Sequence, residues 1–199
     1  MKPHIRAVLM MLCGALCVRG FASTQQIETD GHGEAISVTA TAEMLVDPHT
    51  AWKVITDYDR LAEFIPSMRS SRVVRRDADR LLIEQTGEFS FLFFRQPVEV
   101  KLAVVESPER SVAARAVGGN LREMDGRYTL ERLPSGFVRL SYSGRLVPDF
   151  PIPPVIGKMV VRNVVANQFR AMVREIERRD AQASRHSLPG ANARSATAI

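Results

Sequence analysis

The chain has 199 residues, of which 27 are lysine or arginine and 22 are aspartate or glutamate. Five of the basic residues lie in the end segments 1–22 and 181–199, whereas every acidic residue lies between these segments, so the region 23–180 carries no net charge. Because this balance leaves no excess of basic residues for a nucleic acid, we expect no nucleic-acid partner. The region is long enough for one domain with one core.

The first 22 residues have the pattern of a secretory signal peptide. A basic start, MKPHIR, precedes the apolar run AVLMMLCGALCV, and small residues follow at Gly20 and Ala22. The apolar run is well short of the ~20 residues that a membrane-spanning helix needs. The pattern predicts cleavage after Ala22 and export, most simply to the periplasm. Cys13 and Cys17 would leave with this segment, so the mature chain would offer no thiol for a disulfide, a zinc site or a nucleophile.

The next segment, 23–33, is a polar lead-in, and regular patterns begin at residue 34. Apolar and polar residues alternate from Glu34 to Met44, which predicts a strand with one buried face. Asp47 and Pro48 then supply a helix N-cap and a proline at the first helical position. A short helix follows, and a second short helix carries the stretch TDYDRLAEFIPSM and ends before its proline.

Between residues 69 and 147 the sequence predicts about six strands. Each strand alternates apolar and polar residues, and turn signals such as Asp77-Ala78-Asp79 and Pro134-Ser135-Gly136 separate them. This pattern is typical of an antiparallel sheet with one covered face. The predicted inner face includes Gln85, Phe89, Phe91, Tyr128 and Tyr142.

The last regular element is a helix from about residue 155 to about residue 179. Its apolar residues share one arc, and they are Val161, Val164, Val165, Phe169, Met172, Val173 and Ile176. The segment 181–199 is rich in alanine and serine and has no periodicity, which predicts a disordered tail. The element order predicts an α+β fold, in which a curved antiparallel sheet wraps around the C-terminal helix.

The stretch ATAEMLVDPHTAWKVITDYDRLAEFIPSM resembles the start of the START-like superfamily, which includes polyketide cyclase/dehydrase and coenzyme Q-binding (SRPBCC) proteins. The residues that match its pattern in order are Asp57, Leu61, Phe64, Ile65 and Pro66. The resemblance extends over a domain of residues 34–180. It implies the helix-grip fold, in which the sheet and the long helix enclose an apolar cavity.

The resemblance also implies a place for the apolar knuckle at residues 64–68, because the same turn overhangs the cavity mouth in the family. Phe64, Ile65 and Met68 would then cap a pocket, and we expect them to contribute little to the packed core. The full set of expected ligand-binding residues is Phe64, Ile65, Met68, Gln85, Phe89, Phe91, Tyr128, Tyr142, Val161, Val165 and Gln168.

The polar members of this set have two interpretations each. Gln85 and Gln168 lie on apolar faces, and a buried amide needs a partner, so each either bonds the sheet backbone or contacts a ligand. Tyr128 and Tyr142 are either core aromatic residues or part of the cavity wall. The four histidines lie apart in the sequence, which predicts no metal site, no cofactor and no serine triad.

Three functions agree with this sequence. The first is an exported, non-enzymatic binding or carrier protein for a hydrophobic small molecule, and the resemblance implies a quinone, an isoprenoid or another lipid. The second is a polyketide aromatase/cyclase with tyrosine or arginine as acid–base groups. The third is an accessory subunit that uses the fold, with its Pro-rich segment 148–154, for protein contact. A basic cluster, Arg69 to Arg76, leaves open a transient contact with a membrane surface.

Overall fold

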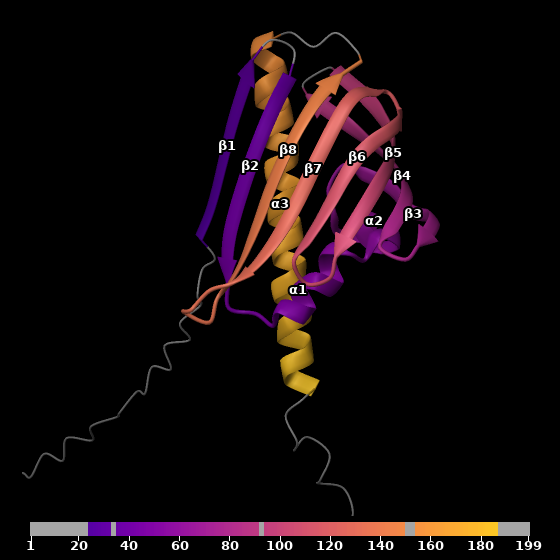
Figure 1. The fold of residues 1–199 in the computed structure, drawn as a ribbon. Coiled ribbons are helices and arrows are strands. Elements are labelled where there is room, and N and C mark those ends of the chain that lie inside the picture. Colours follow the sequence, from indigo (N-terminus) through magenta and orange to yellow (C-terminus); the bar gives the residue numbers. More distant parts are fainter. Residues whose placement is uncertain (1–23, 33–34, 92–93, 150–153, 187–199) are drawn as a thin grey trace, which may run out of the picture.

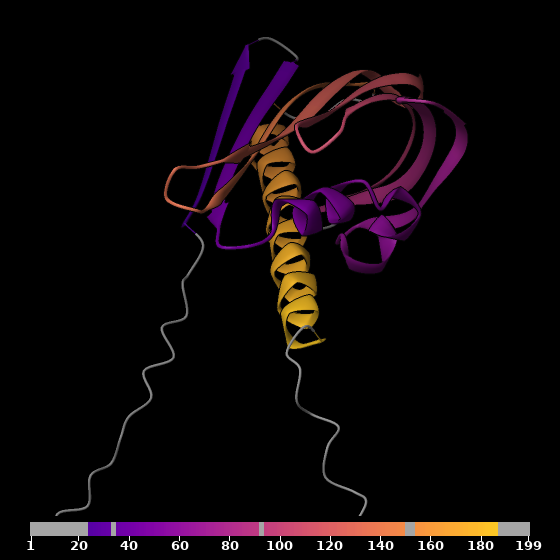
Figure 2. The ribbon, with the colours of Figure 1, turned by 60° about the horizontal axis from the view of Figure 1, so that its bottom comes forward.

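An eight-stranded antiparallel sheet curves around one long helix, which confirms the α+β helix-grip arrangement predicted from the sequence (Figure 1). The computed structural model describes residues 24–32, 35–91, 94–149 and 154–186. The strand order is β1-β2-β8-β7-β6-β5-β4-β3, so neighbours along the chain pair with each other except where β2 meets β8. Figure 2 shows the sheet arching over the helix, with the short helices beside it.

The observed elements follow the predicted order. The strands are β1 (Thr24–His32), β2 (Ala35–Met44), β3 (Met68–Asp77), β4 (Arg80–Phe91), β5 (Phe94–Ser107), β6 (Ser111–Gly119), β7 (Leu121–Arg132) and β8 (Val138–Pro148). The helices are α1 (Pro48–Ile55), the 3-10 helix η1 (Tyr58–Arg60), α2 (Leu61–Phe64) and α3 (Pro154–His186). Among the described residues, no helix is both long and apolar enough to cross a membrane.

The start of α1 carries the predicted cap. The Asp47 carboxylate accepts a hydrogen bond of 2.9 Å from the His49 backbone N–H, and Pro48 occupies the first turn. The backbone N–H of Asp47 donates to the Asp180 carboxylate on α3 at 2.9 Å. The cap therefore also joins the β2–α1 connection to the end of the long helix.

The core lies between the inner face of the sheet and one face of α3. Phe169, Val173 and Ile176 are almost fully buried there, whereas Asn167 and Arg174 on the opposite side are exposed. The predicted apolar arc of the helix is thus buried at Val161 and from Phe169 onward. Val164 and Val165 belong to the same arc but are only half-buried.

The structure differs from the sequence interpretation at both ends of the domain. Residues 24–32 form β1, which pairs with β2 from Thr24↔Glu43 to His32↔Ala35, so this segment belongs to the sheet and is no lead-in to it. Its polar sequence suits an edge strand, and Ile27 is the residue of its described side chains, 25–30, that packs on the core. At the other end α3 runs to His186, past the expected limit near residue 180, and the rest of the tail lies outside the described residues.

Candidate ligand-binding site

Two adjoining cavities lie between the sheet and α3. The first, of about 130 Å³, reaches Tyr58 and Tyr128, and we call it the tyrosine chamber. The second, of about 110 Å³, reaches Ser67 and Gly87, and we call it the Gly87 chamber. The side chains that line both chambers, and so form the boundary between them, are Met68, Gln85, Met124, Tyr142, Val165 and Gln168.

Tyr128 and Tyr142 face each other across β7 and β8. Their ring centroids are 4.8 Å apart, with the ring planes tilted by 43°. Burial raises the pKa of both hydroxyls, that of Tyr142 to about 12, because the phenolate would lose its hydration. Both side chains are therefore neutral at ordinary pH, and they can donate or accept a hydrogen bond without carrying charge.

Tyr142 lies against a pair of glycines that face each other on β7 and β8. A Cβ atom at Gly144 would stand 2.3 Å from the Tyr142 hydroxyl oxygen, and one at Gly126 would stand 3.4 Å from it. Since non-bonded carbon and oxygen atoms do not approach as closely as 2.3 Å, a side chain at position 144 would displace the phenol of Tyr142. The glycine pair therefore sets the position of the Tyr142 hydroxyl beside the cavity.

Gln85 and Gln168 approach the chamber boundary from opposite sides. Gln85 lies on β4, and its carboxamide nitrogen donates to the Ser71 hydroxyl at 3.2 Å. Gln168 lies on α3, is half-buried, and its carboxamide has no hydrogen-bond partner among the described residues. Of the two interpretations of Gln168, the bond to the sheet backbone is thus wrong, and its amide remains available to a ligand.

The chambers bring together most of the expected ligand-binding residues. The ones that line at least one chamber are Ile65, Met68, Gln85, Tyr128, Tyr142, Val165 and Gln168. Val161 does not, because it packs with Ile36, Val38 and Leu146 in a separate part of the core. The side chains of Phe89 and Phe91 lie outside the described residues.

The knuckle is only partly a lid. Ile65 is 6% exposed and belongs to the main core, so the expectation that the knuckle adds little to the packing is wrong for this residue. Ser67 takes a left-handed backbone conformation (φ 67°), and its carbonyl accepts the Glu88 N–H at 2.9 Å. A Cβ at Gly87 would lie 2.6 Å from that carbonyl, so the glycine permits this close contact.

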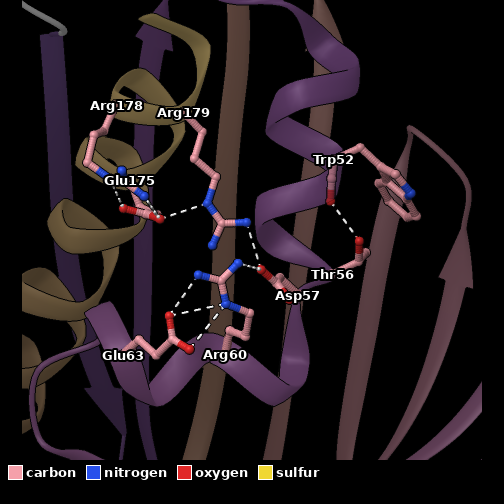
Figure 3. A network of polar contacts seen from close by, with 8 residues as sticks. All are labelled: Trp52, Thr56, Asp57, Arg60, Glu63, Glu175, Arg178 and Arg179. Atoms are coloured by element: carbon pink, nitrogen blue, oxygen red, sulfur yellow. Dashed lines mark hydrogen bonds and ion pairs between the residues drawn. The ribbon is translucent and has the colours of Figure 1, made fainter. Parts of the chain in front are cut away.

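Phe64 lies away from both chambers, against the Arg179 guanidinium of α3 at 5.6 Å from its ring centroid. Arg179 also donates to Asp57 at 2.6 Å and to Glu175 at 2.7 Å (Figure 3). Its remaining nitrogen, Nη2, is buried with no hydrogen-bond partner among the described residues. These contacts fasten the segment between α1 and α2, which carries one wall of the tyrosine chamber, to the long helix.

Glu175 is the acidic centre of this network. Both of its oxygens accept hydrogen bonds of 2.7 Å from Arg178, and one also accepts from Arg179. The hydrogen bonds from Arg178 and then Arg179 hold the pKa of the Glu175 carboxyl at about 2, although burial acts in the opposite direction. Sequence patterns missed the link from this network to Asp57, because Asp57 and Arg179 are 122 residues apart in the chain.

Met124 and Gly126 on β7 are further wall residues that the sequence interpretation missed. They lie four and two positions before Tyr128, respectively, so strict alternation along β7 would have assigned them to the same face. Elsewhere, within the described residues, no group of three or more His, Cys, Asp or Glu side chains is arranged to hold a metal ion.

A comparison with protein families matches residues 44–173 of this chain to the model described as polyketide cyclase/dehydrase and lipid transport. A search of curated proteins found no match. Among solved structures, a STAR-related lipid transfer protein from Xanthomonas axonopodis is similar at 11% identity and a TM-score of 0.63, over 77% of this chain and 93% of that one.

Two further structures have the same fold. The Zhui aromatase/cyclase from Streptomyces sp. R1128 is 13% identical, with a TM-score of 0.61 over 78% of this chain and 97% of that chain. A START superfamily protein from Mycobacterium smegmatis is 15% identical, with a TM-score of 0.59 over 74% of this chain and 98% of that chain. At such identities the likeness shows the fold, and the family model covers well over half of the sequence. The chain belongs to the polyketide cyclase/dehydrase and lipid transport family, and its fold is that of the START-like proteins.

Proposed function

We propose that this protein is an exported binding or carrier protein that holds a quinone, an isoprenoid or another lipid in the tyrosine and Gly87 chambers. The observation that carries the proposal is the chamber boundary, where Met68, Met124 and Val165 stand beside neutral polar groups. Apolar walls favour uptake of apolar surface from water by about 25 cal/mol per Å². The lipid transfer protein among the similar structures supports the same class of function.

The size of the chambers limits what each can take. An apolar cavity of about 150 Å³ accepts a molecule the size of benzene. The tyrosine chamber, at about 130 Å³, is thus suited to one ring or a short branched segment, and a longer ligand has to extend into the Gly87 chamber. Met68 and Met124 stand between the two chambers, and their flexible side chains can move to join them.

A direct test is native mass spectrometry of the mature protein purified from its own host, followed by organic extraction. The proposal expects a retained apolar small molecule that is lost when the protein is denatured. An empty protein that also fails to take up lipids or quinones offered in solution would contradict the carrier function and favour a role in protein contact.

The tyrosine pair is the observation that favours a second function, a polyketide aromatase/cyclase like the enzyme from Streptomyces. Tyr128 and Tyr142 would then donate protons to ketone oxygens of a folded chain. Their raised pKa makes the two hydroxyls weaker acids than an ordinary phenol, which favours binding over proton donation. Incubation with a linear poly-ketone and a search for aromatic products separates the two functions.

Export can be tested on its own. The signal-peptide pattern of residues 1–22 predicts that the mature chain begins at or near Ser23. N-terminal sequencing of the protein from the periplasm of its host is expected to give this start. Recovery of chains with Met1 intact from that fraction would contradict cleavage.

A further inference from the structure

We propose that the ligand is an uncharged molecule with a carbonyl oxygen near its middle and apolar groups on both sides of it, as in a dialkyl or aryl alkyl ketone or an ester. This inference rests on the proposed binding function, because it states what the same cavity selects. It follows from where the polar side chains of the cavity lie and from the charge they carry.

Three polar side chains lie where the two chambers meet, apart from Tyr58 and Tyr128 in the tyrosine chamber and Ser67, Thr86 and Glu88 in the Gly87 chamber. Gln85 from β4, Tyr142 from β8 and Gln168 from α3 each line both chambers, and we call these three residues the polar boundary. On one side of it the tyrosine chamber continues between Leu102, Val112 and Met172, and on the other the Gly87 chamber continues between Val98, Val100 and Leu121. A ligand that fills both chambers therefore passes these three side chains near its middle, where a polar group of the ligand can bond them.

The polar boundary has hydrogen-bond donors to offer. Among the described residues, neither the Gln168 carboxamide nor the Tyr142 hydroxyl has a hydrogen-bond partner, whereas Gln85 is held by Ser71. An amide N–H and a phenol O–H can both donate to one carbonyl oxygen, which has two lone pairs. Because the glycine pair fixes the position of the phenol, one of these donors is oriented before the ligand arrives.

The charge of the lining disfavours an anionic ligand. The described residues that line the two chambers include no lysine, arginine or histidine, and their one acidic member is Glu88 in the Gly87 chamber. Glu88 accepts hydrogen bonds from Arg69 and from Ser90, so Arg69 is already occupied. A carboxylate or phosphate in the chambers would thus lose its hydration without gaining a cation, which is strongly unfavourable.

The test measures displacement of Nile red, an uncharged fluorescent dye, by three molecules of equal chain length. These are a ketone with its carbonyl at the centre, the alkane, and the fatty acid at about pH 8, where its carboxyl is ionised. We expect the fatty acid to bind at least about 100-fold more weakly than the ketone, because its charge is buried unpaired.

A variant of the polar boundary tests the hydrogen bond itself. Gln168→Leu keeps the side-chain size but removes both hydrogen-bonding atoms, and we expect it to weaken ketone binding roughly 3- to 10-fold without weakening alkane binding. Gln182→Leu, on an exposed part of the same helix, is the matched control and should change neither. Thermal melting of both variants shows whether the fold is retained, and Gln168→Met replaces the leucine variant if it is not.

The outcomes separate this inference from the function on which it rests. Equal or tighter binding of the ionised fatty acid, or an unchanged ratio of ketone to alkane affinity in the Gln168 variant, would overturn the carbonyl assignment while leaving a binding protein. If Nile red does not bind and none of the three molecules protects the protein against melting, the binding function is wrong, and this inference fails with it.

Discussion

Tyr142 owes its position to two residues that have no side chain. Its hydroxyl occupies the space that a Cβ at Gly144 would need, and Gly126 opposite adds room on the next strand. In a strand, glycine ordinarily costs about 0.5–1 kcal/mol relative to alanine, so its presence at both positions calls for a local reason. The phenol that lies against them is that reason.

We therefore expect Gly144→Ala to destabilise the protein by about 1–3 kcal/mol, as overpacking does, despite the better strand propensity of alanine. Chemical denaturation measures the loss. Gly118→Ala is the control, because the atoms nearest to a Cβ there belong to the Lys101 side chain and lie at an ordinary contact distance, 3.6 Å or more. Tyr142→Val in the Gly144→Ala background should recover part of the stability, and strictly additive losses would contradict the contact.

The lowered pKa of Glu175 leads to a second prediction at the scale of single residues. Its folded pKa of about 2 lies below the usual unfolded value of about 4.3, so its contribution to stability is complete above the unfolded value. That contribution is lost as the pH falls from about 4.3 through about 2. Arg178 and Arg179 on its own helix face this carboxylate, and the Asp57 carboxylate approaches from the segment before η1.

Glu175→Gln should accordingly lower the urea midpoint near pH 7 and lose less stability than the wild type between about pH 5 and pH 2. Midpoints measured across this range provide the comparison. Glu177→Gln, a neighbouring glutamate on the same helix, is the control and should follow the wild-type profile. Parallel profiles for Glu175→Gln and the wild type would show that other groups determine the acid sensitivity.

At the scale of elements, Arg179 is a polar link between α3 and the segment that leads into the short helices η1 and α2. It is mostly buried and joins Glu175 on its own helix to Asp57 and Phe64 on the other side. Removing one partner of a buried ion pair leaves the others uncompensated. The tyrosine chamber, which has Leu61 and Ile65 in its wall, depends on the segment that this link holds.

We expect Arg179→Met to cost about 2–4 kcal/mol and to weaken Nile red binding, because the segment from Asp57 to Ile65 loses its anchor. Arg174→Met, an exposed arginine on the same helix, should change stability by less than about 0.5 kcal/mol. Chemical denaturation and Nile red titration of the two variants show whether Arg179 supports both the stability of the fold and the binding of the dye. Equal stability and equal dye binding in the two variants would mean that the contacts of Arg179 with Asp57 and Phe64 are dispensable.

The sequence predicted those elements that carry a strong apolar period. Apolar and polar residues alternate clearly in residues 35–44 and in the strands from 68 to 148, and α3 has a broad apolar arc. In these elements the pattern of apolar residues therefore indicates which face is buried. β1 could not be recognised this way, because among its described side chains, 25–30, Ile27 alone packs on the core, and such an edge strand needs few apolar residues. The last turns of α3 lack an apolar face for the same reason, since nothing there is buried.

The whole molecule depends on β1 more than its polar sequence suggests. It completes the sheet beside β2, whose edge would otherwise present unpaired backbone groups. A chain that lacks residues 24–32 should have a lower denaturation midpoint and should self-associate in size-exclusion chromatography. A double substitution of the exposed Gln26 and Glu28 by serine keeps the strand and should remain like the wild type. A stable monomer after the deletion would contradict this role.

The candidate site was predicted where it coincides with the core and missed where it depends on distant contacts. Gln85, Tyr142 and Gln168 were found because polar residues on apolar faces stand out in a sequence. Phe64 was assigned to the pocket because the family resemblance implies that the apolar knuckle overhangs the cavity mouth, but its ring contacts Arg179, a contact set by the way α3 passes the short helices. Such a contact follows from the assembled fold and has no local sequence signal.

The close fit of Tyr142 over Gly144 also restricts how this protein can change by mutation. A large residue at position 142 and a side chain at position 144 exclude each other, since their atoms would compete for one space. We expect relatives that gain a side chain at the second position to carry a small residue at the first, so that the two sites vary together over evolutionary time. The order of such substitutions is also constrained, because a chain that loses the glycine while it keeps the tyrosine passes through a less stable state.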